Sequence, residues 1–388
     1  MIEDTDGDGT FDKRSVFAEN LVLPNGAQWY DGALYVCSPP FIWRYEDTDG
    51  DGKADKEERI FGKFNFGGNS SAFHGPVLGP DGRFYWCGGQ HGWILGDLSP
   101  DWNYDLPWTT KAPGVFSVWP DGSDYEVHSL AGVANPVEVT FTPEGDTLGT
   151  VAIFDQNNGR HDALVHGIYG GIYSSADDRI RATPGVKYTG DALKAFSRRG
   201  HVAPCGVVRF RGDQFGPRYE NDVFLCEFNT HKVFHLDIER AGSTYRAQDN
   251  LFVSSSNPYV HFTDVMQDAD GSLLVIDTGG WFFQGCPTSR IARPEVLGAI
   301  YRVRKIDDTP VEDARGLRLA WEGASIEEHK DKPFVSPNIG FTVVAAYEGS
   351  HWFTEEQVVQ FGFREELDGA IKGVKQLRQS TRRIAYRK

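Results

Sequence analysis

The feature of this sequence that most constrains its fold is a tight acidic turn that recurs between short apolar runs. An Asp-Gly turn in that setting is a strong signal for a β-hairpin. The first two turn glycines, Gly32 and Gly82, are 50 residues apart, and the chain from Gly145 to Gly271 has room for two more units. A multi-stranded repeat of this length is typical of a propeller blade. The sequence therefore predicts an all-β fold, a β-propeller with five recognisable blades. The turns are Asp31-Gly32, Asp81-Gly82, Glu144-Gly145, Asn221-Asp222 and Asp270-Gly271.

A propeller must also close its ring, and both ends of the chain offer segments for this. Residues 11–17 are typical of the last strand of an earlier blade, and the apolar run 341–346 is a candidate closing strand. Residues 355–379 carry apolar side chains at helical spacing, which predicts a short C-terminal helical appendage. We divide the chain into a propeller with its acidic loops over 1–305, a linker over 306–338, and a closing strand with a helix over 339–388.

The composition limits the partners of this protein. Its net charge is −16, and a nucleic-acid partner is disfavoured because phosphate binding needs a basic face. Forty per cent of the residues are hydrophobic, which is enough for a large core and argues against disorder. No apolar run reaches the length of a membrane span. The chain opens with Met1-Ile2-Glu3-Asp4, without the basic and apolar segments of a signal peptide.

The five cysteines carry no metal or haem spacing. There is no CxxC, CxxCH or zinc-type pattern, so the sequence predicts neither covalent haem nor a thiolate zinc site. One or two disulfides are open to the chain, and one thiol must stay unpaired within it. The cysteines are Cys37, Cys87, Cys205, Cys226 and Cys286.

The strongest chemical signal is an acidic loop over residues 47–58. Carboxylates stand at loop positions 1, 3, 5, 9 and 12, with glycine at position 6, which is the spacing of a calcium loop. A less complete copy near the N-terminus has Ser15 where the last Glu would stand. β-type runs follow both loops, so we expect turns between strands and a structural role for Ca2+; an acidic solvated turn is the alternative. The candidate metal ligands are Asp47, Asp49, Asp51, Lys53, Asp55 and Glu58 in one loop, and Asp4, Asp6, Asp8 and Asp12 in the other.

Polar residues also gather at the starts of the repeats and after their second apolar runs. The first strand of a propeller blade lines the central channel, so these side chains are expected to converge on one axis. A concave set of polar groups is the usual form of a binding site, although any one histidine is more often a packed residue. The candidate catalytic residues are His74, Asn135, His201 and Asp264, and the candidate substrate-binding residues are Gln90, His91, Asn229, His231 and Trp281.

Several long segments resemble a known family. They are DTDGDGTFDKRSVFAENLVLPNGAQW, DTDGDGKADKEERIFGKF, HVAPCGVVRFRGDQF, NDVFLCEFNTHKVFHLDI and LLVIDTGGWFFQGCPTSRIARPEVLGAIYRVRK. Together they resemble the "membrane-bound dehydrogenase" propellers of planctomycetes and verrucomicrobia, many of which carry a C-terminal c-haem domain and are described as haem-binding proteins. The resemblance reaches Lys305 and implies a six-bladed family and a periplasmic or secreted location. The c-haem motif is missing from this chain, and a cytoplasmic location stays open.

More distantly, the pattern is similar to the soluble quinoprotein glucose and sorbosone dehydrogenases. In those enzymes a histidine before a GPDG hairpin acts as base, which implies this role for His74, and Asn135-Pro136 corresponds to another site segment. The resemblance implies PQQ as cofactor. However, Ala134 replaces an arginine, and His261 and Phe262 stand where paired arginines would hold the quinone. A polyanionic quinone needs such cations, so these departures argue against PQQ.

These observations favour a carbohydrate-directed enzyme of the sugar or polyol dehydrogenase type, with His74 as general base. Its partners would be a sugar or polysaccharide-derived small molecule and an electron acceptor. One alternative is a metal-dependent carbohydrate lyase or hydrolase, in which histidines and Asp155, Asp264 or Asp277 hold a second divalent metal at the channel. The other is a non-catalytic propeller that binds a glycan or a protein.

Overall fold

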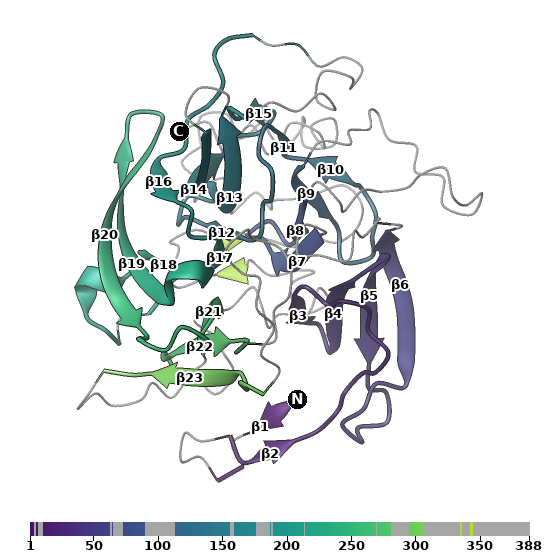
Figure 1. Ribbon diagram of the computed structural model, residues 1–388. Coiled ribbons are helices and arrows are strands. Elements are labelled where there is room, and N and C mark those ends of the chain that lie inside the picture. Colours follow the sequence, from purple (N-terminus) through teal and green to yellow (C-terminus); the bar gives the residue numbers. More distant parts are fainter. Residues whose placement is uncertain are drawn as a thin grey trace.

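The computed structural model contains a ring of five antiparallel sheets, which we number as blades 1 to 5 in chain order (Figure 1). Each blade begins at the centre of the ring, and its later strands follow outward in sequence order, except that β15 does not belong to blade 3. The predicted all-β propeller with five blades is therefore confirmed. The structure describes residues 1–3, 5–6, 11–62, 64, 73–89, 113–155, 159–175, 187, 189–212, 214–268, 270–280, 295–305, 334–335 and 342–343.

Four blades have four strands each, and blade 5 has three among the described residues. Blade 1 comprises β3 (Ala27–Tyr30), β4 (Ala33–Ser38), β5 (Phe41–Glu46) and β6 (Lys56–Gly62). Blade 2 comprises β7 (Phe73–Leu78), β8 (Phe84–Gly88), β9 (Gly114–Val118) and β10 (Glu126–Val127). Blade 3 comprises β12 (Val139–Phe141), β13 (Thr147–Asp155), β14 (Gly159–Gly167) and β16 (Ser197–Gly200). Blade 4 comprises β17 (Pro204–Arg209), β18 (Val223–Glu227), β19 (Lys232–Ala241) and β20 (Thr244–Ser254), and blade 5 comprises β21 (Phe262–Gln267), β22 (Leu273–Asp277) and β23 (Ala299–Val303).

Smaller elements connect the blades. Strands β11 (Ser129–Ala131) and β15 (Gly171–Ile172) form a parallel pair beside blade 3. The short 3-10 helices η2 (Pro217–Tyr219) and η3 (Phe228–Thr230) lie in blade 4, where η3 joins β18 to β19. None of the described elements is a helix with the length and apolarity needed to cross a bilayer.

The predicted hairpins form at the acidic turns. In the turn between β3 and β4, Asp31 has φ 46° and Gly32 has φ 74°. A two-residue hairpin loop with a type I′ turn requires positive φ at both residues. Asp-Gly suits this turn because glycine, which lacks a Cβ, adopts positive φ without strain. The turn pairs Tyr30 with Ala33 and fixes the register of the whole blade.

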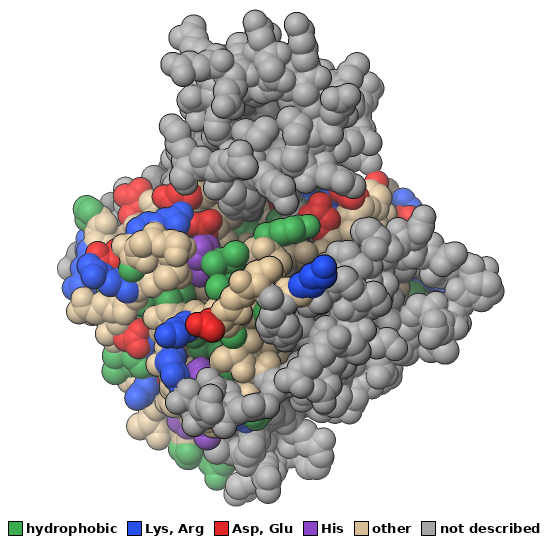
Figure 2. Space-filling view, turned by 90° about the horizontal axis from the view of Figure 1, so that it is seen from above, with side chains coloured by type: hydrophobic (Ala, Val, Ile, Leu, Met, Phe, Trp, Pro, Cys, Tyr) green, Lys and Arg blue, Asp and Glu red, His purple; other side chains and the backbone are tan. Residues whose placement is uncertain are grey.

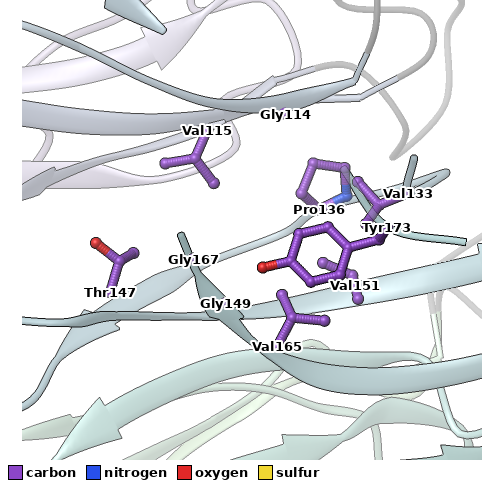
Figure 3. A pocket seen from close by; sticks show the side chains of 10 residues that line it. All are labelled: Gly114, Val115, Val133, Pro136, Thr147, Gly149, Val151, Val165, Gly167 and Tyr173. Carbon is purple, nitrogen blue, oxygen red and sulfur yellow. The ribbon is translucent and has the colours of Figure 1, made fainter. Parts of the chain in front are cut away.

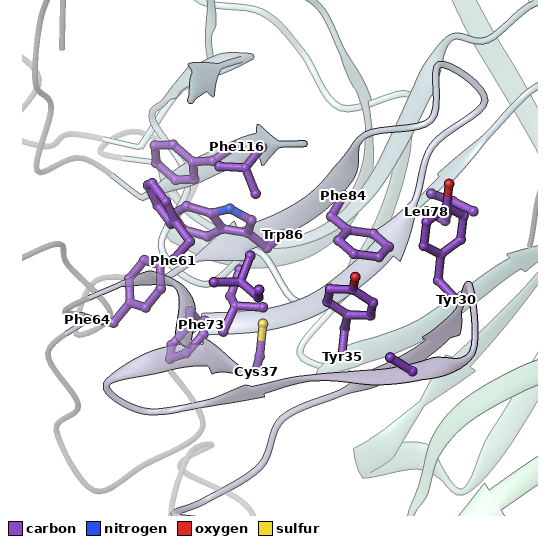
Figure 4. Packing of buried hydrophobic residues seen from close by; sticks show 14 of the residues in the cluster. Tyr30, Tyr35, Cys37, Phe61, Phe64, Phe73, Leu78, Phe84, Trp86 and Phe116 are labelled. Atoms are coloured by element: carbon purple, nitrogen blue, oxygen red, sulfur yellow. The ribbon is translucent and has the colours of Figure 1, made fainter. Parts of the chain in front are cut away.

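Aromatic side chains fill the space between blades 1 and 2 (Figure 4). Phe64 stacks on Phe73 with ring centroids 4.1 Å apart, and Trp86 stacks on Phe116 at 4.5 Å. All four are almost fully buried. Since a buried aromatic side chain contributes about 2–3 kcal/mol relative to exposure, this cluster holds the first two inner strands firmly in place.

The N-terminal segment pairs with itself and not with a blade. Strand β2 (Lys13–Arg14) pairs with β1 (Ile2–Glu3) in an antiparallel hairpin. The adjoining Phe11 ring lies under the guanidinium of Arg302 in β23, 5.4 Å away. Phe11 thus lies beside the last described strand of blade 5, while Phe17 packs with Val36 and Tyr45 of blade 1. The backbone pairing expected of an earlier blade's last strand is not formed by residues 11–17.

Two short strands belong to the C-terminal part of the chain. β24 (Phe334–Val335) lies in the predicted linker and pairs with β25 (Thr342–Val343), which lies in the predicted closing run 341–346. The predicted helix over 355–379 falls outside the described residues. The division into domains therefore stays a prediction.

The described cysteines are free thiols. Cys37, Cys87, Cys205 and Cys226 form no disulfide with one another, and Cys286 falls outside the described residues. Cys226 packs against Phe224, Val233 and Phe262 in the core shared by blades 4 and 5.

We expect thiol reagents to modify Cys226 slowly in the native protein. Its side chain has 0% exposure, and burial raises the pKa of its thiol well above the ordinary value, so the reactive thiolate is scarce. Labelling followed by peptide mass spectrometry measures the rate, with the partly exposed Cys205 as internal comparison. Labelling of Cys226 as fast as in denatured protein would contradict the packing of blade 4.

Candidate functional site

The starts of the inner strands bring polar residues from several blades to one end of the ring. Because every blade begins at its inner strand, the first residues of β7, β12, β17 and β21 face the same end (Figure 1). His74 and Asp264 lie within β7 and β21, while Asn135 and His201 lie just before β12 and β17. The structure thus places all four predicted catalytic residues at this end of the channel, although not all in contact.

Two carboxyl groups meet at the channel. Glu138, just before β12, forms a side-chain hydrogen bond with Asp264 of β21. Blade 4 lies between them: the backbone N–H of Val207 donates to Glu138 Oε2 at 2.7 Å. The backbone N–H of Val265 donates to Asp264 Oδ1, also at 2.7 Å. Both residues are half-buried, as expected for groups that protein surrounds but that line a channel.

This pair holds one proton tightly. Burial raises the pKa of Glu138 well above its usual range, and the negative charge of Asp264 raises it further. Burial also raises the pKa of Asp264, to about 6, although hydrogen bonds from Val265 and Glu138 oppose the shift. Two carboxyls in contact cannot both ionise easily. At neutral pH, Asp264 is therefore the ionised acceptor and Glu138 the protonated donor.

The close approach of the strands depends on one glycine. A Cβ at Gly206 in β17 would lie only 2.4 Å from Asp264 Cα and 2.5 Å from its Oδ1. Thr150 of β13 completes the frame, since its hydroxyl accepts from the Glu138 N–H at 3.1 Å and donates to the Cys205 carbonyl at 2.9 Å. Backbone groups and a hydroxyl thus fix the carboxyl pair in position.

His74 lies on the side of blade 2 that faces the carboxyl pair. In the β7–β8 ladder His74 is paired with Cys87, and directly opposed residues project from the same sheet face. Cys87 packs in one cluster with Val139 of blade 3, and burial, together with the nearby charge of Glu138, raises the pKa of its thiol. The predicted base therefore projects from the face of blade 2 that is turned toward blade 3, where Glu138 precedes the inner strand β12.

A second cluster of polar residues lies on the rim between blades 4 and 5. Asn229 in η3 donates from its side-chain amide to the carbonyl of His201 at 3.4 Å. His231 and His261 have ring centroids 5.6 Å apart, and His261 stacks on Phe228 at 4.3 Å. Asn229 and His231, two of the predicted residues, therefore lie together on this rim, whereas the His201 ring binds the Arg160 carbonyl of blade 3 at 2.8 Å.

Other candidates have different surroundings. Asn135 Oδ1 is buried and has no hydrogen-bond partner among the described residues. Asp277 Oδ1 accepts the backbone N–H groups of His261 and Gly279, both at 2.8 Å, so this oxygen stabilises a turn. Gln90, His91 and Trp281, and the side chain of Asp155, fall outside what the structure describes.

The acidic loop between β5 and β6 brings three carboxylates together. Ligand oxygens of Asp47, Asp49 and Asp51 lie within 4.8 Å of one another. Asp55 turns its carboxylate to the hydroxyl and N–H of Thr48, at 2.7 and 3.1 Å. Glu58 lies in β6 opposite Arg44, and Lys53 donates its N–H to Asp51. The three aspartates are thus the loop's candidate cation ligands.

The N-terminal loop repeats part of this arrangement. The Thr5 N–H and hydroxyl bind the two Asp12 oxygens at 3.0 and 2.6 Å, as Thr48 binds Asp55 in the other loop. Asp12 therefore stabilises the turn through both oxygens. Asp6 is exposed, and Asp4 and Asp8 fall outside the described residues.

A small apolar cavity among the described residues is separate from these polar groups. It lies between blades 2 and 3 and is lined by Val115, Val133, Val151, Val165 and Tyr173 with nearby Gly, Pro and Thr residues (Figure 3). No charged side chain lines it, so it offers no chemistry. On the surface, acidic and basic side chains are interspersed over the described part of one face (Figure 2), which suits a protein without a nucleic-acid partner.

Sequence reasoning overlooked two of these residues as site members. Glu138 stands inside the apolar run Val137-Glu138-Val139, and a charged residue in an inner-strand run was the available signal. His261 enters the sequence comparison only at the position of a quinone-binding arginine and is not among the candidate site residues. Its relation to His231 depends on two loops that are distant in sequence.

These features define a five-bladed β-propeller with a carboxyl pair in its channel and a histidine-rich rim. The chain belongs to the family described as domain of unknown function DUF7133, whose model matches residues 1–283. No curated protein matches the sequence.

Among solved structures, the chain is similar at low identity to sugar dehydrogenases, two of which are described with PQQ. The PQQ-bound aldose sugar dehydrogenase from Streptomyces coelicolor shares 15% identity at a TM-score of 0.40, covering 68% of this chain and 90% of that one. The holo PQQ domain of pyranose dehydrogenase from Coprinopsis cinerea shares 12% identity at a TM-score of 0.47, and the match covers 77% of this chain and 86% of that one. A putative oxidoreductase (glucose dehydrogenase) from Thermus thermophilus shares 16% identity at a TM-score of 0.39, and the match covers 73% of this chain and 96% of that one.

Proposed function

We propose that this chain is a carbohydrate-directed enzyme of the sugar-dehydrogenase type, acting on a sugar or polyol at the channel end that bears His74 and the carboxyl pair. The observation that carries the proposal is the joining of Glu138 and Asp264 beside the wall that holds His74. Polyol hydroxyls both donate and accept hydrogen bonds. An ionised Asp264 accepts from one hydroxyl, and a protonated Glu138 donates to another.

In this proposal His74 removes the hydroxyl proton of the carbon that is oxidised. A neutral imidazole has a pKa close to working pH, which suits a general base. The carboxyl pair orients the ring through neighbouring hydroxyls and exchanges its shared proton with them. The carbon-bound hydrogen leaves as a hydride to a freely diffusing two-electron organic oxidant, for which a redox dye substitutes in the assay, so that the alcohol carbon becomes a carbonyl and the oxidant is reduced by two electrons.

The described channel residues do not fit PQQ. The quinone carries several carboxylates and needs cationic partners, whereas the channel presents Glu138 and Asp264, and no Lys or Arg forms an ion pair with either among the described residues. His261 and Phe262 occupy the positions at which the distant relatives carry arginines. No step of the proposed reaction is therefore given to a quinone.

The same carboxyl pair favours a second candidate, a metal-dependent carbohydrate lyase or hydrolase. Carboxylates without a cationic partner are suitable ligands for a divalent ion, and such an ion acidifies a carbon-bound proton or activates water. This candidate needs no electron acceptor.

A dye-reduction assay with a panel of sugars and polyols, run with and without added PQQ and with metal analysis of the protein, tests these proposals. Dye reduction without PQQ supports the leading proposal. Dye reduction that depends on PQQ would contradict the exclusion of the quinone. Metal-dependent cleavage of a polysaccharide without dye reduction would replace the leading proposal with the second one. Sugar binding without any turnover would show that the protein is a non-catalytic binding module.

The family named by the sequence resemblance, the planctomycete and verrucomicrobial dehydrogenase propellers, supports a periplasmic or secreted location as part of this proposal. A calcium-stabilised loop suits that location, because free Ca2+ is abundant outside the cytoplasm. We include structural Ca2+ at Asp47, Asp49 and Asp51 in the proposal.

We expect a chelator to lower the melting temperature and added Ca2+ to restore it. Without the ion, three carboxylates within 4.8 Å repel one another, and a ligand bound only by the native state stabilises it by mass action. The shift should be about 2–8 °C. Asp49→Ala should melt at the chelator-treated temperature and respond to neither chelator nor Ca2+. A wild-type melting curve that ignores chelator would remove Ca2+ from this loop.

A further inference from the structure

Two rim histidines have fixed tautomers. His231 Nδ1 contacts the carbonyl oxygen of Val260, and His261 Nδ1 contacts the carbonyl oxygen of Gly279 at 2.8 Å. A carbonyl oxygen only accepts, so each Nδ1 must carry the hydrogen. In a neutral ring the lone pair then lies on Nε2. Neither Nε2 has a hydrogen-bond partner among the described residues.

The two rings are held close together by unrelated segments. Their centroids are 5.6 Å apart at an interplanar angle of 64°. His231 follows η3 of blade 4, and His261 immediately precedes β21 of blade 5. Two imidazoles on one tetrahedral metal, with metal–nitrogen bonds of about 2.1 Å, have ring centroids roughly 5 Å apart. The observed spacing therefore needs only a small adjustment to share an ion.

The backbone holds both rings in advance. His231 has φ 58°, a left-handed conformation that a non-glycine residue seldom adopts. His261 is stacked on Phe228. A histidine whose Nδ1–H is bound to a backbone carbonyl and whose Nε2 is open is the usual form of a metal-ligating histidine. Both rings are half-buried, which leaves room for water to complete the coordination.

We propose that His231 and His261 form a binding site for a transition-metal dication, with both Nε2 atoms as ligands and water in the remaining positions. Imidazole nitrogen favours Cu2+, Zn2+ and Ni2+ over Ca2+ and Mg2+, which prefer oxygen. The site is therefore chemically distinct from the aspartate loop, and it does not depend on the proposed reaction.

The test is titration of the full chain with Cu2+ in excess Ca2+, which keeps the aspartate loop occupied, followed by electron paramagnetic resonance. We expect one bound Cu2+ with hyperfine structure from two nitrogens, displaced by Zn2+ only in large excess because nitrogen ligands bind Cu2+ more tightly. His231→Asn, which tolerates the left-handed backbone, and His261→Gln should each weaken binding at least ~10-fold. Melting temperatures without metal show that both variants are folded.

Two control variants make the outcome decisive. Asp49→Ala removes a carboxylate of the acidic loop, and His201→Gln removes a neighbouring rim histidine whose Nε2–H is bound to the Arg160 carbonyl at 2.8 Å. Both should bind Cu2+ as the wild type does. Unchanged binding in the two rim variants, a signal without nitrogen coupling, or equal loss in His201→Gln would overturn the two-histidine site.

Discussion

His74→Ala should abolish turnover while leaving the melting temperature nearly unchanged. If His74 takes the substrate proton, its loss removes general-base catalysis, which contributes about 10²–10⁴-fold to the rate. The side chain is half-buried at the start of β7, so its truncation opens no core cavity. Steady-state assays with the best sugar of the panel, together with thermal melting, measure the two effects separately.

His235 provides the matched control for this prediction. It is 1% exposed, and its Nε2 binds Asp222 Oδ2 at 2.7 Å within blade 4. His235→Ala leaves a buried carboxylate without its partner and should cost about 3 kcal/mol of stability, while the folded fraction stays active. If His74→Ala behaves like the control, losing stability but keeping activity per folded molecule, then His74 is a packing residue and the catalytic role is lost.

The architecture was predictable because local signals determine it. Each Asp-Gly turn places its glycine in the left-handed conformation that a tight turn needs, as Gly32, Gly82 and Gly271 show, and repeated hairpins at blade spacing leave few alternatives to a propeller. The end of the ring on which His74, Asn135, His201 and Asp264 lie follows from the same repeat, since each stands at or before an inner strand.

The contacts among the site residues were not predictable, because they depend on how neighbouring blades pack. Glu138 meets Asp264 only because blade 4 carries Gly206 where a Cβ would clash, and no local pattern reveals that spacing. His231 meets His261 across two loops that are 30 residues apart. Pairings of this kind arise from the closed ring, which a linear pattern does not encode.

The carboxyl pair leads to the second large prediction, in which stability and activity change in opposite directions. Asp264 and Glu138 have raised native pKa values, so the native state binds protons more tightly than the unfolded chain, whose carboxyls titrate at about 3.9 and 4.3. Stability contributed by protonation is therefore present below about pH 4. The part contributed by Asp264 is lost as the pH rises from about 4 through about 6, the native pKa of Asp264. Stability keeps falling at higher pH for as long as native Glu138 keeps its proton.

Glu138→Gln should remove most of this pH dependence. The amide stays neutral in the unfolded chain as well, keeps an oxygen for the Val207 N–H and keeps a donor for Asp264. At pH 7 the variant should be more stable than the wild type, because the raised pKa makes Glu138 take up a proton on folding, and the amide does not carry this linkage cost. Denaturant unfolding from pH 4 to pH 8 measures the difference.

Turnover of Glu138→Gln should nevertheless fall about 10-fold or more, because an amide cannot exchange the shared proton with substrate. A buried acid that lowers stability is expected where it serves a function, because active sites commonly trade stability for activity. A variant that is more stable and fully active would show that the pair has no catalytic part, while one that loses stability at pH 7 would show that the carboxyl contact holds the blades together. Only higher stability with lower activity agrees with a proton-exchanging pair in the channel.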